Sequence, residues 1–366
     1  MIQPIKGVAA EESLSQGEKR VAWVDVMRAV MMFAIALGHA LDARPTSGSM
    51  LNQYVYSFHV PAFFFLSGLL FRGKKESFFA FTVKKFKSLM IPYYIFSILS
   101  ILIFLVLGSV ASDGLGVAVK TTDLLPNLWG MLYGNGSTGY MKWNLPLWFV
   151  PCLFITLLIF YWIDRVVLAD GKRNSRKFIG MMVGSLALSF LNYYVLGIQK
   201  LPFGLETAVY MLPFFVVGYW TGRTDMLSKL QSGVRYGLGA AFVIAGAILA
   251  FVNGPRVGYV GSAYNNLAVY YSSAMLSTAG AVMLLQTASN KLLIYVGRNT
   301  LPILLMHKFP IVFFQMFLVD TMAKNELLGV SIAIVIAGAS CAMALLAGEV
   351  IRRIAPFALG RVRKQN

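Results

Sequence analysis

The stretch "WVDVMRAVMMFAIALGHAL" at residues 23–41 decides the fold class. Apart from Asp25, Arg28 and His39, its residues are apolar or small. Its length is close to the ~20 residues that a helix needs to cross the hydrocarbon core of a membrane. In lipid, a crossing segment must satisfy its own backbone hydrogen bonds, and a continuous apolar run of this length is too long for a barrel strand. We therefore predict a transmembrane helix.

Comparable apolar runs recur along all 366 residues of the chain. Apolar residues make up 58% of the sequence, charged residues 13%, and the mean hydropathy is +0.68, which lies outside the range of soluble domains. We predict an all-α, polytopic integral membrane protein of about ten transmembrane helices. The predicted spans are residues 23–41, 53–71, 88–108, 147–163, 179–196, 205–220, 236–253, 266–286, 299–318 and 327–348.

The connections between these spans differ in positive charge. One alternate set of connections, together with both termini, holds 24 Lys and Arg residues, whereas the other set holds 6. The positive-inside rule places the richer set, and therefore both termini, in the cytoplasm. Topology and attraction to anionic membrane lipids account for the net charge of +17, so we expect no nucleic-acid partner.

These boundaries divide the chain into a cytoplasmic tail (1–22), a membrane domain (23–348) and a basic cytoplasmic tail (349–366). The first span follows a polar tail without a clear cleavage site, so we interpret it as a retained helix and not a signal peptide. Cys152 and Cys341 both fall inside predicted helices, which argues against a disulfide framework. The sequence contains no cluster with metal-ligand spacing, and we expect no metal.

Arg28 and His39 lie eleven positions apart in the first span. On a helix this spacing returns to within ~20° of the same face with a rise of ~16 Å, so the two side chains share a face but cannot touch. Asp25 and Asp42 each lie three residues away from one of them, within reach on a helix. The alternative interpretations are that Arg28 extends to the inner interface and that His39 only packs, but ionisable groups inside spans are typical of functional sites.

The first span resembles the first helix of the membrane acyltransferase 3 family, whose marker is Arg or Lys, ten residues, then His. The resemblance is closest to the branch of fucose 4-O-acetylase-like proteins. All three histidines of the chain fall in its motifs. In order, these are "WVDVMRAVMMFAIALGH" (23–39), "YVYSFHVPAFFFLSGLLF" (54–71), "KKFKSLMIPYY" (84–94), "LPLWFVPCLF" (145–154) and "VGRNTLPILLMH" (296–307).

The resemblance implies an O-acyltransferase of the cell's inner, or cytoplasmic, membrane. Such an enzyme moves an acyl group, commonly acetyl, from acyl-CoA inside to a hydroxyl of a glycan or lipid-linked sugar outside. In that picture His39 is the catalytic residue, either as the base that takes the acceptor proton or as the carrier of the acyl group. Arg28 then stabilises charge on the donor or binds its pantetheine arm.

The family also implies a cationic site for the phosphates of coenzyme A, usually an Arg-x-Arg pair before the third helix. Lys85 and Lys87 occupy the aligned positions here. Lysine binds phosphate as a point charge without the bidentate geometry of a guanidinium, so the donor contacts differ from the family pattern. The alternative is that this stretch is only the basic flank of a span.

Three further residues are candidates for the acceptor site. His59 is predicted at a depth similar to that of His39, and Pro61 close behind it distorts the helix. His307 is predicted near the bilayer centre and Glu206 at the outer start of the sixth span. For each of them a purely structural hydrogen-bonding role is the alternative.

Two other classes of protein fit the composition. A polytopic transporter would also have about ten helices and polar residues at mid-membrane depth. A non-catalytic membrane component of a glycan assembly complex would have no need for His39. The order of the five motifs favours the acyltransferase, with partners in envelope glycan assembly as a further expectation.

Overall fold

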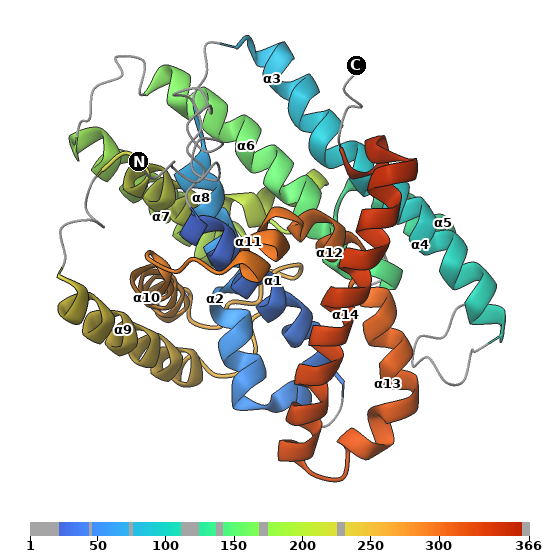
Figure 1. Cartoon of the computed structure of the whole chain (residues 1–366). Helices are drawn as coiled ribbons and strands as arrows, with labels where there is room; N and C mark the ends of the chain where they lie inside the picture. The colour runs from blue at the N-terminus through green and yellow to red at the C-terminus, as the bar shows by residue number, and fades with distance from the viewer. Residues whose placement is uncertain are drawn as a thin grey trace, which may run out of the picture.

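Helices make up nearly all of the described chain (Figure 1). The structure is a computed structural model, and it describes residues 22–43, 46–72, 76–110, 124–136, 142–167, 175–224 and 231–360. None of these residues forms a strand beyond one isolated bridge between Gly258 and Ala263. The long helices are α1 (Ala22–Leu41), α2 (Met50–Leu70), α4 (Ile91–Val110), α6 (Phe149–Val166), α7 (Ser175–Leu191), α8 (Leu205–Thr221), α9 (Ser232–Val252), α10 (Leu267–Leu285), α13 (Lys308–Met322) and α14 (Glu326–Ile354).

Shorter helices complete the fold. They are α3 (Phe78–Lys85), α5 (Leu124–Tyr133), α11 (Lys291–Arg298) and α12 (Thr300–Met306). A π-helical turn, Phe86–Met90, joins α3 to α4 without a break. Each predicted span coincides with a helix, or with two consecutive helices, of the described chain. Most of the predicted tail 1–22 lies outside the described residues.

The all-α membrane fold of about ten predicted spans is confirmed. Eight helices of the described chain are long and apolar enough to cross a membrane, or nine if α12 and α13 form one bent span. The second predicted span is a helix of 21 residues, α2, but it is not among them. Its Asn52, Gln53 and His59 lower its mean hydropathy.

Helix α2 lies inside the bundle, which explains why it can carry polar residues. Ser49 caps its start, since the hydroxyl accepts a hydrogen bond from the backbone N–H of Asn52 at 3.2 Å. Against α8 it packs at backbone distance, because a side chain on Gly68 or Gly218 would overlap the facing carbonyl oxygen. The structure keeps α2 as one helix through Pro61, so the predicted distortion does not interrupt it.

The ends of the helices meet in two separate groups, which we name the Asp25 end and the His39 end after residues of α1. At the Asp25 end, Arg298 at the end of α11 pairs with Asp25. At the His39 end, Arg256 between α9 and α10 pairs with Asp42 after α1. Which end faces the cytoplasm stays a prediction.

Helices α12 and α13 are bent by 48° relative to each other, with His307 at the junction. Pro310 has no backbone N–H, so it cannot donate to the carbonyl of Met306 four residues earlier. The missing helical bond accounts for the bend. The break places His307 in the buried interior.

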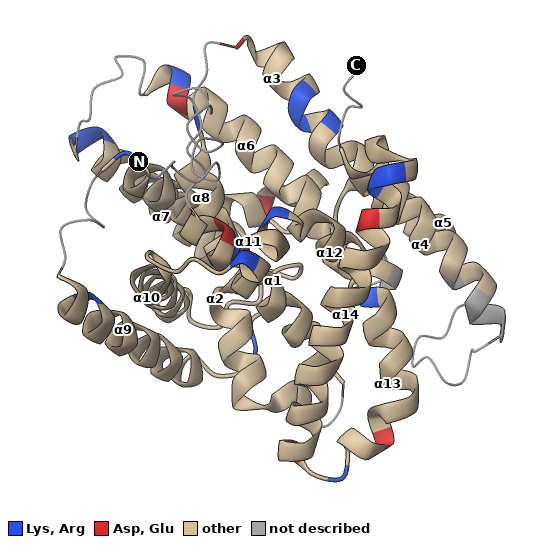
Figure 2. Cartoon of the chain, in the orientation of Figure 1, with Lys and Arg blue, Asp and Glu red and all other residues tan. Residues whose placement is uncertain are grey.

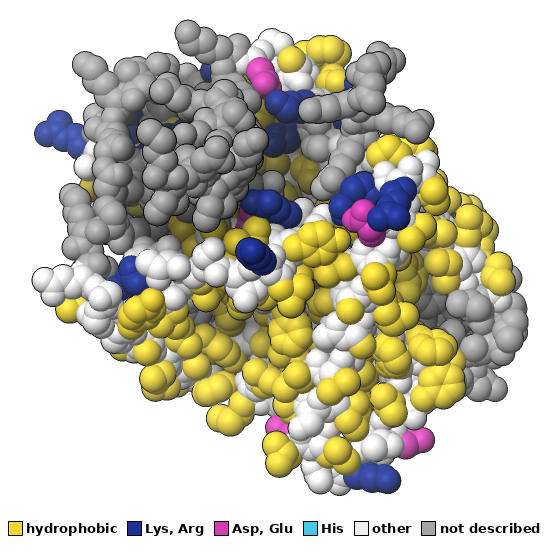
Figure 3. Space-filling view, in the orientation of Figure 1, with side chains coloured by type: hydrophobic (Ala, Val, Ile, Leu, Met, Phe, Trp, Pro, Cys, Tyr) yellow, Lys and Arg dark blue, Asp and Glu magenta, His cyan; other side chains and the backbone are white. Residues whose placement is uncertain are grey.

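Hydrophobic side chains form a broad belt on the face shown in Figure 3, over α9, α13 and α14. Figure 2 shows that Lys and Arg gather mainly above this belt, toward the Asp25 end. On these three helices, Val252, Phe317 and Val335 are about 70% exposed (69%, 68% and 70%), as expected of side chains that face lipid.

Candidate active site

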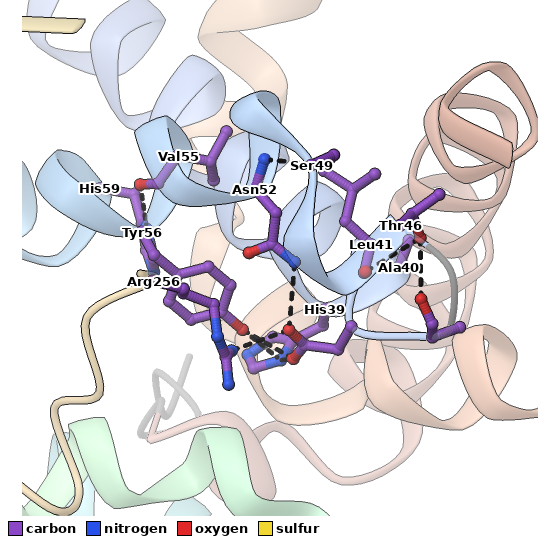
Figure 4. A network of polar contacts seen from close by, with 12 residues as sticks. His39, Ala40, Leu41, Thr46, Ser49, Asn52, Val55, Tyr56, His59 and Arg256 are labelled. Atoms are coloured by element: carbon purple, nitrogen blue, oxygen red, sulfur yellow. Dashed lines mark hydrogen bonds and ion pairs between the residues drawn. The ribbon is translucent and has the colours of Figure 1, made fainter. Parts of the chain in front are cut away.

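His39 lies in the last turn of α1, and its side chain is 15% exposed. Figure 4 shows the imidazole ring of His39 beside the phenol ring of Tyr56, from α2, and the guanidinium group of Arg256. The Nδ1 atom of His39 is 3.3 Å from Oδ2 of Asp42 and 3.2 Å from the hydroxyl of Tyr56. Three segments that are distant in the sequence therefore meet around one imidazole.

Asp42 is the centre of this polar network. Its Oδ2 accepts a hydrogen bond from Tyr56 at 2.8 Å, and its Oδ1 accepts one from Arg256 at 2.7 Å and one from Asn52 at 3.5 Å. Burial alone would raise the pKa of Asp42. The hydrogen bond with His39 and the charge of Arg256 more than offset that effect, and they hold the pKa of the carboxyl well below its usual range. Asp42 is therefore an anion that can only accept hydrogen bonds.

These contacts assign the tautomer of His39. Tyr56 has one hydroxyl proton, and its shorter contact is with Asp42. The ionised Asp42 has no proton to donate, so Nδ1 of His39 is the donor of their hydrogen bond. The proton on Nδ1 leaves a lone pair on Nε2. An imidazole held in this way by a carboxylate is a suitable base or nucleophile.

His307, which the sequence analysis names as a candidate acceptor-site residue, is the second histidine next to His39. Its ring centroid is 5.4 Å from that of His39, with the planes tilted by 38°. Its Nδ1 is 2.8 Å from the carbonyl oxygen of Ile303 and 3.1 Å from that of Leu304. The side chain is fully buried.

His59 lies behind Tyr56 and not beside His39. The ring of Tyr56 is 5.0 Å from that of His59 and 6.1 Å from that of His39, edge-on to both. The Nδ1 atom of His59 donates to the carbonyl oxygen of Val55. His59 therefore supports the position of Tyr56, and its contact with the site is indirect.

The connection between α9 and α10 covers the His39 end of the site. Arg256 stacks over the ring of Tyr56 with its guanidinium carbon 4.3 Å from the ring centroid. Tyr259 donates from its hydroxyl to the backbone carbonyl of Tyr56, and its ring is 5.8 Å from that of His59. The bridge between Gly258 and Ala263 tightens this connection into a turn.

Helix α13 also contacts the end of α1. The side-chain amide of Gln315 donates to the carbonyl oxygen of Ala40 at 3.0 Å and to that of His39 at 3.4 Å. These carbonyls belong to the last turn of α1, where intrahelical partners are missing. Gln315 therefore fixes the end of the helix that carries His39.

A cavity of about 230 Å³ lies along the face of α1 that leads to His39. Arg28, Met32 and Ile35 line it, so it follows the helix face that the sequence predicts to join Arg28 and His39. The other walls come from α2, the π-helical turn before α4, α6, α11 and α12. On α1 the lining ends at Ile35, four residues before His39. On α12 it ends at Leu304, three residues before His307. Both histidines lie one helical turn beyond the cavity.

At the Asp25 end the cavity is bordered by two arginines. Asp25 is buried, with 1% exposure, and its carboxylate lies 3.6 Å from Arg28 and 3.1 Å from Nε of Arg298. Arg28 and Arg298 keep 27% and 52% of their side chains exposed. A side chain on Gly297 would overlap the backbone of Asp25, and this close approach brings Arg298 to the cavity.

Lys85 and Lys87 lie close in sequence to the cavity lining. Leu89 lines the cavity, and Lys85 precedes it by four residues on the same continuous helix. The ammonium of Lys85 is 5.5 Å from the ring centroid of Phe81, and Lys87 is exposed. Both cations lie in or beside a π-helical turn, a feature that is frequent at functional sites.

Glu206 contacts a different part of the protein. Its carboxylate accepts hydrogen bonds from the side chain of Asn135 at 3.2 Å and from the backbone N–H of Leu201 at 3.0 Å. Asn135 also donates to the carbonyl of Leu201 at 3.0 Å. Glu206 thus joins the end of α5 to the start of α8. Among the described contacts none links it to a histidine.

Three functional candidates escape the sequence interpretation. Arg256 enters it only as one positive charge of a connection. Tyr56 and Arg298 lie in quoted motifs without a role. The signal that could have found Arg256 is its isolation as the single cation between two spans. For the described residues, no group of three or more His, Cys, Asp or Glu side chains could hold a metal ion.

Comparisons with known proteins identify the family. A family model described as an acyltransferase domain matches residues 21–348, from the start of α1 into α14. Searches of the curated proteins and of the solved structures found no match. The match covers most of the chain and all residues of the site described above. The chain therefore belongs to the acyltransferase 3 family, and its long apolar helices make it a multi-pass membrane acyltransferase.

Proposed function

We propose that the protein is a transmembrane O-acyltransferase of the inner, or cytoplasmic, membrane. It takes an acyl group, acetyl in the simplest case, from cytoplasmic acyl-CoA. It delivers this group to a hydroxyl of a glycan or lipid-linked sugar on the other side. In this proposal the Asp25 end faces the cytoplasm and the His39 end faces the acceptor.

The cavity along α1 is the observation that carries this proposal. It leads from the two arginines of the Asp25 end to Ile35, one helical turn before His39, and the helix rise from Arg28 to His39 is about 16 Å. An extended pantetheine arm along this passage would direct its thioester toward the histidines and leave its phosphates outside at the Asp25 end. The apolar lining suits a chain without charge.

The donor phosphates need cations at the Asp25 end. Arg28 and Arg298 are both partly exposed there, and their guanidinium groups bind phosphate in a bidentate way. Lys85 and Lys87 supply further positive charge as point charges. Asp25 positions the two arginines, because its buried carboxylate lies between them.

At the His39 end, Asp42 positions the imidazole and stabilises its positive charge when it forms. Tyr56 and Arg256 position Asp42 in turn. The free Nε2 of His39 acts on the thioester, either as base or as nucleophile. His59, Glu206 and His307 are the proposed acceptor-side residues, and the direct contact with His39 favours His307.

The test uses purified protein in sealed liposomes. Radiolabelled acetyl-CoA is supplied outside, and a panel of methyl hexopyranosides is enclosed inside, so that only molecules in one orientation can transfer. We expect labelled ester inside the liposomes, with succinyl-CoA as a second donor to compare. The matched control is Cys341→Ser, a buried change on α14 outside the site.

Three results separate the classes of protein. Transfer that persists unchanged in His39→Ala contradicts the assignment of His39. Passage of unmodified glycoside across the membrane without ester formation indicates a transporter. Absence of both transfer and passage in the wild type indicates a non-catalytic component of an assembly.

A further inference from the structure

One buried nitrogen of the site has no hydrogen-bond partner among the described residues, and it belongs to His307. Its Nδ1 is within hydrogen-bond distance of two backbone carbonyl oxygens, of Ile303 and Leu304, and carbonyl oxygens only accept. Nδ1 therefore carries the proton of the neutral ring. The unpartnered Nε2 is then a lone pair in the protein interior.

Such an atom is costly unless it serves a ligand or a reaction, since a buried acceptor without a partner loses its hydration. His39 presents the same arrangement, with its proton on Nδ1 and its lone pair on Nε2. The two ring centroids are 5.4 Å apart, close enough for one hydroxyl group to lie within hydrogen-bond reach of both rings. Two imidazoles, each with a lone pair on Nε2, therefore lie next to each other in the protein interior.

Acyl transfer through His39 needs a second base, because one nitrogen atom cannot carry the acyl group and also take the proton of the acceptor. If Nε2 of His39 holds the acyl group, the same atom cannot take the proton of the incoming hydroxyl. Asp42 holds the other nitrogen of His39, so that nitrogen is not available either. A second imidazole with a free lone pair at this distance removes the conflict.

We propose that His307 is a second catalytic residue, which takes the proton of the acceptor hydroxyl while His39 carries the acyl group. This inference rests on the proposed acyl transfer and specifies its second half. It also commits to one of the two mechanisms that the sequence leaves open for His39.

The first step is attack of the His39 Nε2 lone pair on the thioester carbonyl carbon. The new bond is N–C, the C–S bond breaks, and the electron pair leaves with the coenzyme A thiolate. The proton on Nδ1 stays in place, so the acyl-imidazole is positively charged next to the anionic Asp42. That carboxylate offsets the charge.

In the second step the acceptor oxygen attacks the acyl carbon while its proton passes to Nε2 of His307. The C–N bond breaks, and its electron pair returns to Nε2 of His39. The products are the ester, neutral His39 and a protonated His307. Transfer of that proton to the thiolate or to solvent restores the starting state, so that atoms and charge balance.

The test follows the label on the protein with the whole chain in detergent or liposomes. Wild-type protein is mixed with radiolabelled acetyl-CoA without an acceptor, and protein-bound label is measured. A methyl hexopyranoside that the wild type accepts is then added, or water alone serves as acceptor, and release of the label is timed. Hydroxylamine, which attacks an acyl-imidazole without a base, releases any remaining label.

His307→Gln keeps an amide that can donate to the carbonyls but has no basic nitrogen. We expect it to take up label at a rate within about twofold of wild type and to release it on acceptor addition at least about 100-fold more slowly, the usual contribution of a general base. Hydroxylamine should release the label from both proteins equally. His39→Ala should take up none.

His307→Ala with free imidazole is the second variant, and restored release of label is the expected result, since a structural role would not be rescued by a diffusible base. Ile311→Val, a buried change one turn further along α13, controls for packing and should behave as wild type.

Release from His307→Gln at the wild-type rate, or failure of folded His307→Gln to take up label, overturns the inference. Turnover by a wild type that never carries label overturns it too and leaves the proposed function intact. A wild type that neither carries label nor transfers it to any acceptor overturns both.

Discussion

Each end of α1 has an ion pair between an aspartate and an arginine, but the two pairs have different surroundings. At each end an aspartate of this helix or its extension pairs with an arginine from a distant segment, Asp25 with Arg298 and Asp42 with Arg256. At the Asp25 end the carboxylate is buried and both neighbouring arginines stay partly exposed at a cavity. At the His39 end the arginine is engaged by Asp42 and Tyr56, and the carboxylate also serves an imidazole.

The same type of ion pair can therefore support two kinds of site, depending on which of its two residues faces the ligand. Where the aspartate is the positioning group and the arginines face a cavity, the result suits an anionic ligand. Where the arginine is the positioning group and the aspartate faces a histidine, the result suits proton transfer or nucleophilic attack. Variants at the two ends should therefore change different kinetic constants.

Removal of the imidazole should give the largest effect. We expect His39→Ala to lower kcat by on the order of 10⁴-fold or more, because triad-type sites lose about this much with their central residue. The KM for acyl-CoA should stay within about twofold, since the Asp25 end is intact. Initial rates over a range of donor concentration measure both constants, and equal loss in kcat and donor binding contradicts the separation of the two ends.

Asp42→Asn should give the next largest effect, on the order of 10³-fold in kcat. The amide can donate as well as accept, so it no longer assigns the proton of His39 to Nδ1, and it cannot stabilise a positive ring. Asp25→Asn is the matched change at the other end, and it should raise the KM for the donor instead. Similar kinetic changes in both variants would remove the distinction between the ends.

The same carboxyl predicts a dependence on pH. The pKa of Asp42 is lowered in the folded protein, so its contribution to stability is fully present above its ordinary pKa of 3.8 and is lost as pH falls below that value. Thermal unfolding in detergent between pH 7 and pH 3 should show a smaller acid destabilisation in Asp42→Asn than in wild type. An unchanged acid response would mean that Asp42 is not the group concerned.

Arg28→Ala should raise the KM for acyl-CoA by about 10- to 100-fold, which corresponds to the loss of a charge-assisted hydrogen bond of about 1.5–3 kcal/mol. Arg298→Ala should act in the same direction. Neither variant should change the rate at which bound donor reacts, which single-turnover experiments at saturating donor measure. A large fall in that rate with unchanged KM would place Arg28 at the reacting atoms.

Lys85→Ala and Lys87→Ala should give the smallest effect, a rise of about two- to fivefold in donor KM, because charges at the protein surface contribute about 0.2–1 kcal/mol. The effect should shrink at high salt. Lys291→Ala, at the start of the amphipathic α11, serves as the control for loss of an exposed charge. An equal rise in KM for Lys291→Ala would mean that general surface charge, and not a donor site, is measured.

The fold could be predicted from the sequence because membrane spans are read from length and apolarity. The span 53–71 is predicted as well and is helix α2, although the buried Asn52 and His59 of this helix lower the apolarity that serves as the signal. The short helices α3, α5 and α11 are not predicted, since no apolar run of spanning length marks them. The orientation of the chain rests on charge alone and stays a prediction.

The candidate site could be predicted only along one helix. Arg28 and His39 share a face by helical arithmetic, and the cavity follows that face. Contacts between segments could not be found in this way, because Arg256 is 214 residues from Asp42 and no periodicity relates them. Proximity of His307 to His39 depends on the break near Pro310, whose direction a sequence does not specify.

The hydrogen bond from Gln315 to Ala40 has a consequence for the biosynthesis of the chain. It joins residues 275 apart, so the end of α1 reaches its final state only after α13 has entered the membrane. During synthesis α1 is made with His39 long before Gln315 and His307, the residues that contact its end in the folded protein. A nascent or truncated chain without α13 therefore lacks Gln315 and its hydrogen bond to the end of α1.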